Sequence, residues 1–78
     1  MGTSFKIEAE NMVEAINKLR KSLDEGEKIG LYLDSISIFI KDNNGEYSGI
    51  GDNGIEVSVN TLFGEKPTKK VVILCHLD

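Results

Sequence analysis

The sequence predicts an α+β fold, a two-layer sandwich in which one N-terminal helix packs on a mainly antiparallel sheet of about five strands (β-α-β-β-β-β). One stretch carries apolar residues at helical spacing, several short stretches alternate apolar and polar residues, and Asn-Gly dipeptides separate strand-like segments. The chain has 78 residues, of which 40% are hydrophobic and 28% charged. This length and composition indicate one globular domain spanning residues 1–78.

The first expected element is a strand over residues 4–9. Phe5, Ile7 and Ala9 fall on one side of this segment, and Lys6 and Glu8 fall on the other. Such a period of two indicates a strand with one buried and one solvated face.

A helix is expected over Asn11–Glu25. Asn11 is a favourable N-cap, and Glu14 three residues later completes a capping-box pattern. The expected inward stripe consists of Met12, Ile16, Leu19 and Leu23. Gly26 follows the last apolar residue of this stripe, so we expect it to end the helix.

The segment 29–42 is strand-like, but its apolar residues change parity. The inward positions are Ile29, Leu31 and Leu33, followed by Ile36, Ile38 and Ile40. A one-residue shift exchanges the two faces of a strand, so two strands meet at Asp34-Ser35 or one strand carries a bulge there. Two residues without glycine make a very short connection, and we therefore favour the bulged strand.

The remaining elements are short strands separated by turns. In order, we expect a turn at 42–45, a strand at 46–51, a turn at 52–54, a strand at 55–60, a loop at 64–67 and a strand at 70–77. The last segment is nearly all apolar, as in a strand covered on both faces. One helix covers only part of such a sheet, so a second copy of the chain is expected to complete it as a homodimer.

Charge and cysteine content exclude several classes of protein. The net charge of −4 argues against partners that carry phosphates, whether nucleic acid or an anionic membrane surface. Cys75 is the single cysteine and cannot form an internal disulfide, and no apolar run approaches the length of a membrane span. We therefore expect a cytoplasmic protein.

Three glycines, Gly49, Gly51 and Gly54, match the G-x-G-x-x-G pattern of a nucleotide-binding loop. Phosphate binding by that pattern requires a helix after the last glycine, because the phosphates rest on the N-terminus of the helix. The residues that follow Gly54 alternate as a strand does, so we interpret the glycines as turn residues and expect no cofactor.

Two further motifs fail as metal or catalytic sites. Residues 42–53 resemble a calcium loop, but Tyr47 and Asn53 stand where that loop requires glycine and glutamate. Cys75 and His76 are neighbours on a strand, so their side chains point to opposite faces and cannot form a dyad. No metal is expected, and Cys75 is interpreted as a buried apolar residue.

Aromatic and acidic residues are the candidates for binding a partner protein. Tyr32 and Phe39 have the opposite parity to their apolar neighbours, so they either form an exposed patch on the outer face of the sheet, or cover a second core or pack beside the bulge. Acidic residues of the expected hairpins would face a basic groove of the partner. The full candidate set is Tyr32, Phe39, Asp42, Glu46, Tyr47, Asp52 and Glu56.

These observations favour a small acidic, non-catalytic module that binds or inhibits a partner protein. Accessory and inhibitor proteins of phages and mobile elements include chains of this size and charge, which is an analogy only. The alternative is a protein that binds a small ligand or nucleotide, or a small enzyme, using the glycine hairpin or Cys75. A further alternative is nucleic-acid binding through Lys18, Arg20 and Lys21, which lie among acidic neighbours on the helix.

Overall fold

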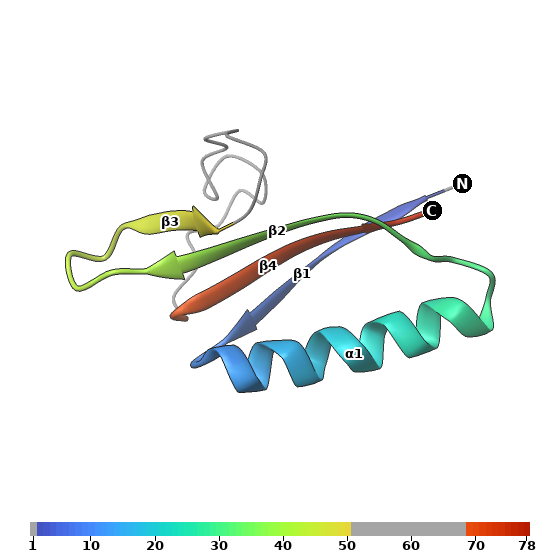
Figure 1. The fold of residues 1–78 in the computed structure, drawn as a ribbon, viewed down its shortest axis with the longest axis horizontal. Helices are drawn as coiled ribbons and strands as arrows, with labels where there is room; N and C mark the ends of the chain where they lie inside the picture. The colour runs from blue at the N-terminus through green and yellow to red at the C-terminus, as the bar shows by residue number, and fades with distance from the viewer. Residues whose placement is uncertain (1, 51–68) are drawn as a thin grey trace.

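The structure is a computed structural model that describes residues 2–50 and 69–78 (Figure 1). Its elements are β1 (Thr3–Ala9), α1 (Met12–Lys28), β2 (Leu33–Lys41), β3 (Tyr47–Ile50) and β4 (Val71–Leu77). One helix packs on an antiparallel sheet, which confirms the α+β prediction. The described residues contain four strands instead of five, and residues 55–60, where a further strand was expected, lie outside the described part.

The last strand of the chain lies inside the sheet. The strand order is β1-β4-β2-β3, and β4 is antiparallel to both of its neighbours. β1 and β2 are therefore parallel to each other and are joined through α1, with β4 inserted between them as in a split β-α-β unit. Ile73 of β4 lies opposite Ile7 of β1 and Ile38 of β2, so these three side chains share one face.

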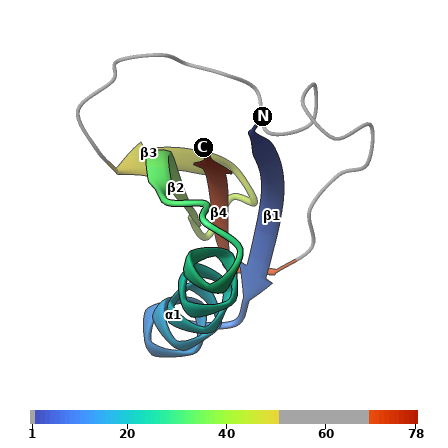
Figure 2. The same cartoon turned by 90° about the vertical axis from the view of Figure 1, so that its right-hand side faces the viewer.

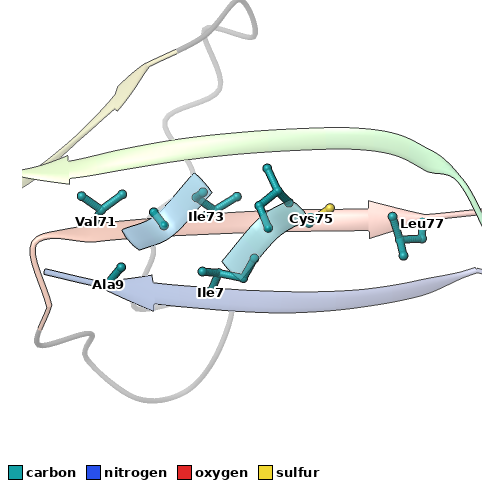
Figure 3. Packing of buried hydrophobic residues seen from close by; sticks show 8 residues of the cluster. Ile7, Ala9, Val71, Ile73, Cys75 and Leu77 are labelled. Atoms are coloured by element: carbon teal, nitrogen blue, oxygen red, sulfur yellow. The ribbon is translucent and has the colours of Figure 1, made fainter. Parts of the chain in front are cut away.

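The main core lies between this face and α1 (Figure 3). Its buried members are Ile7, Ala9, Ala15, Leu19, Val71, Ile73, Cys75 and Leu77. β4 is also buried on its other face, since Val72 is as fully buried as Ile73. The prediction of a strand covered on both sides at 70–77 is confirmed.

The N-terminus of α1 forms as its sequence indicates. The backbone N–H of Glu14 donates to the Oδ1 atom of Asn11 at 2.8 Å, which makes Asn11 the N-cap. The Glu14 carboxylate accepts in turn from the backbone N–H of Glu10 at 3.2 Å, one residue earlier than in a standard capping box. Two free donors at the start of the helix are thereby paired.

The prediction that Gly26 ends the helix is wrong, because α1 continues to Lys28. Gly26 is buried, and a Cβ atom at this position would lie only 2.7 Å from Cδ1 of Leu77. The glycine therefore allows the last turns of the helix to approach the end of β4 closely.

The helix ends instead at Lys28, and Gly30 follows the C-cap residue Ile29 with a φ of +79°, which is in the left-handed region. The N–H of Leu31 donates to the carbonyl of Gly26 at 2.9 Å, and the N–H of Gly30 donates to the carbonyl of Glu27 at 3.1 Å. This pair of hydrogen bonds is the Schellman motif, which pairs free carbonyls at the C-terminus of a helix. The segment from Ile29, which was expected to begin a strand, therefore forms the end of the helix and the connection to β2.

The buried stripe of α1 is shifted from the expected one. Ala15 is fully buried at its centre, whereas Ile16 is 36% exposed at its margin. A methyl side chain at Ala15 lets the helix approach the sheet closely, which leaves the larger Ile16 on the flank. Leu19 is buried, and Met12 and Leu23 pack against the same core as predicted.

β2 carries the predicted bulge. Its register with β4 shifts between Leu33 and Ser35, so Asp34 is the extra residue. The strand begins at Leu33 instead of Ile29. The inward row of Ile36 and Ile38 after the bulge is confirmed, because both pack against the main core.

The turn between β2 and β3 is also confirmed. Gly45 has a φ of +82°, and its N–H donates to the carbonyl of Asp42 at 3.1 Å. The Asp42 carboxylate accepts from the backbone N–H groups of Asn44 at 2.8 Å and Glu46 at 2.9 Å. An aspartate side chain thus fixes the turn through local hydrogen bonds.

We expect the Gly30→Ala variant to unfold with a free energy about 1 kcal/mol lower than the wild type, because an alanine is strained in the left-handed region. Gly30→Asn serves as the control, since asparagine tolerates this conformation better. Urea unfolding followed by circular dichroism measures both values. Equal stability of the alanine variant and the wild type would contradict this description of the helix end.

Candidate functional site

Helix α1 packs mainly on β1 and β4, and β3 is the strand farthest from it in both views (Figures 1 and 2). On one flank of the helix, Lys18 donates to the backbone carbonyl of Glu8 in β1 at 2.8 Å. The opposite flank, which carries Val13 and Ile16, is therefore the one on the β2 side of the helix. Val13 is 72% exposed, so no described element covers most of its side chain.

The helix-side face of β2 continues this exposed apolar surface. Ile38 and Ile40 lie opposite Ile73 and Val71, so their side chains share the face on which α1 packs. Ile40 is half-buried and belongs to neither apolar cluster, and Leu33 at the other end of the strand is 47% exposed. We name this surface the apolar ledge; its residues are Val13, Ile16, Leu33, Ile36, Ile38 and Ile40.

The margins of the apolar ledge are mostly acidic. Exposed carboxylates at these margins belong to Asp24, Glu27, Asp34, Asp42 and Glu46. Asp24 and Glu27 follow Val13 and Ile16 on the same helix flank, at spacings of three or four residues that also place Arg20 there. The other three carboxylates lie near the two ends of β2. The ledge therefore combines an apolar floor with a rim of net negative charge.

The outer face of the sheet is closed near the β2–β3 turn. Phe39 is 7% exposed and packs with Val72, with Tyr47 and Leu74 packed against them. A Cβ atom at Gly49 would lie 3.5 Å from the Phe39 ring, so the exposed glycine lies beside this ring on the neighbouring strand. Of the two alternatives for Phe39, the structure shows the second core.

Tyr47 belongs to the same cluster. Its hydroxyl donates to the backbone carbonyl of Lys69 at 2.6 Å, and Lys41 lies over its ring at 6.0 Å from the centroid. Burial raises the pKa of the phenol above its ordinary value, and the carboxylates of Glu8 and Glu10 add to this. Tyr47 therefore holds the β3 hairpin to the start of β4.

The other predicted partner-binding residues are not gathered in one place. Tyr32 is 60% exposed and exchanges backbone hydrogen bonds with Asp78, at the opposite end of β2 from Phe39. Asp42 and Glu46 are exposed at the turn, where Asp42 has the structural role described above. Asp52, Glu56, Gly51 and Gly54 lie outside the described residues.

Sequence reasoning missed a contact between Ser4 and His76, which are far apart in the chain. The Ser4 hydroxyl lies 2.7 Å from Nδ1 of His76 on the outer face. A serine beside an imidazole is the first requirement of an activated nucleophile. A Cβ atom at Gly2 would lie 2.5 Å from Nε2 of the same ring, and within residues 2–50 and 69–78 no carboxylate orients the imidazole. The pair therefore lacks the third group of a triad.

Cys75 faces the main core and is 3% exposed, while His76 faces the outer side, which confirms that they form no dyad. Burial raises the pKa of the Cys75 thiol above its ordinary value, which disfavours the reactive thiolate. Across the part of the chain that the structure describes, no three His, Cys, Asp or Glu side chains are grouped so that they could hold a metal ion.

No helix among the described residues has the length and apolar character needed to cross a membrane. Comparison with protein-family models, curated proteins and solved structures finds no match to this chain. The geometry of the described surfaces is therefore the basis for a functional proposal.

We expect thiol reagents to modify Cys75 in the native protein far more slowly than in the same chain unfolded in urea, because the thiol is buried and its pKa is raised. Absorbance of a chromogenic disulfide reagent at pH 8 measures both rates. Equal rates in the two states would show that the main core does not enclose Cys75.

Proposed function

We propose that this chain is a small protein-binding module that docks a partner protein on the apolar ledge. The observation that carries the proposal is a partly exposed apolar row beside the main core, in which Val13, Ile16 and Leu33 are exposed and Ile40 is half-buried. Contiguous exposed apolar surface with a polar rim is typical of interaction sites in proteins.

The dimensions of the layers support a face that the described residues cover incompletely. Where β3 pairs with residues 38–41 of β2, the four strands are roughly 19 Å wide, since neighbouring strands lie about 4.8 Å apart. A helix with its side chains is about 10 Å across, so α1 covers only about half of that width. Ile40 lies at this end of the sheet, whereas Ile36 and Ile38 already pack against the main core.

Two other surfaces are less suited to binding. The edge of β1 offers backbone groups for strand pairing, but the Lys18 ammonium occupies the carbonyl of Glu8, and lysines at edges hinder pairing. The outer face has its apolar residues Phe39 and Val72 already buried. Within residues 2–50 and 69–78, the ledge remains as the extended apolar surface that is at least partly exposed.

The proposal includes an accessory or inhibitory role and a cytoplasmic location. A module of this kind acts by occupying a surface of its partner, which requires a docking face and no reactive group. The single free thiol of Cys75 suits a reducing compartment.

We expect the Val13→Lys variant to lose its protein partner in affinity capture from a lysate of the source organism, with retention falling about tenfold. Tyr32→Lys is the matched control, because it adds the same charge at a similarly exposed site on the outer face. Quantitative mass spectrometry compares the wild type and both variants. A wild type that retains no protein, or equal losses for both variants, would contradict docking on the ledge.

A further inference from the structure

We infer that the apolar ledge binds an amphipathic α-helix of the partner, with basic residues on both sides of its apolar stripe. This inference rests on the proposed function, which it narrows to one class of partner. It is drawn from the shape, length and charge of the ledge.

The shape of the ledge fits a helix lying beside α1. Val13 and Ile16 lie on the flank of α1 on this side, and Ile36, Ile38 and Ile40 lie on the helix-side face of β2, the first two partly covered by the main core. Helices packed side by side have axes about 8–10 Å apart, which matches the width left uncovered where β3 pairs with β2. A helix in this position would complete the second layer in the same way as α1 covers β1 and β4.

The length of the ledge sets the length of the helix. From Leu33 to Ile40 the strand rises about 23 Å at about 3.3 Å per residue. A helix of about 15 residues spans the same distance at 1.5 Å per residue. Its contact stripe would have apolar residues at positions i, i+3 or i+4, i+7 and i+11.

The charge of the rim selects among possible occupants. The margins carry five carboxylates against Arg20 and Lys28, the latter beside Asp24 and Glu27, so their charge is negative on balance and lysines or arginines that flank the stripe of the partner helix would be attracted. A second copy of this chain would bring the same acidic rim against this one, and like charges at an interface are unfavourable. A partner helix with basic flanks is therefore favoured over a second copy.

Two model peptides of about 15 residues test the inference. Both carry leucines at the spacing given above and a fluorescein label; one has lysine and the other glutamate at the remaining positions. Fluorescence anisotropy against the full chain is measured at low and high salt. We expect the lysine peptide to bind about tenfold more tightly than the glutamate peptide, and more weakly at high salt.

The variants locate the bound peptide. We expect Val13→Lys to weaken the lysine peptide about tenfold, while Tyr32→Lys changes its affinity by less than about twofold. Both side chains are exposed in the wild type, and thermal unfolding checks that each variant is folded. Equal weakening by the two variants would overturn the inference, because it would show a charge effect without a site.

Other outcomes separate the inference from the proposed function. If Val13→Lys loses a captured protein but neither peptide binds the wild type, the ledge binds a protein that does not present a basic helix, and only the inference fails. If sedimentation shows a homodimer that Val13→Lys dissociates, the occupant is a second copy, and the inference is again overturned. If no protein is captured at all, the proposed function fails.

Discussion

The pairing of β4 with both β1 and β2 is the constraint on which the rest of the structure depends. β4 bonds to both neighbours along its length and is buried on both faces, with Val72 and Ile73 fully covered. β1 and β2 have no direct contact in the sheet, so β4 alone connects them. α1 directly follows β1 in the chain and packs mainly on β1 and β4. It therefore covers the helix-side face of β2 only in part.

Local chemistry explains which parts of this fold were predictable. The N-cap at Asn11 and the turn at Asp42 depend on residues within four positions of each other, so the local residue types are sufficient to predict them. The bulge at Asp34 follows from the parity change of the apolar residues on either side of it in the same segment. The C-terminus of α1 was predicted at the wrong residue because two glycines, Gly26 and Gly30, lie near it, and either could end a helix. Gly26 is required by the approach of Leu77, a contact over about fifty residues that no local pattern contains.

The candidate site was only partly predictable for the same reason. The parity of Ile36, Ile38 and Ile40 indicated their common face, but the strand order places β2 at the margin of α1, so that Ile36 and Ile38 pack against the main core and Ile40 does not. Parity also left two environments open for Phe39, and the packing of its ring with Val72 depends on tertiary contacts. Composition indicated the acidic character of the chain, whereas the position of its carboxylates around the ledge required the fold.

The most direct measurement is the exposure of isoleucine methyl groups to a soluble paramagnetic agent, observed by NMR of the methyl-labelled chain. We expect strong broadening of the Ile40 methyl signal and little broadening of Ile7 and Ile73, because only Ile40 lies on the helix-side face beyond the main core. Addition of the basic helical peptide should protect Ile40 and leave the other two unchanged. An Ile40 signal as protected as that of Ile73 in the free protein would contradict an exposed apolar ledge.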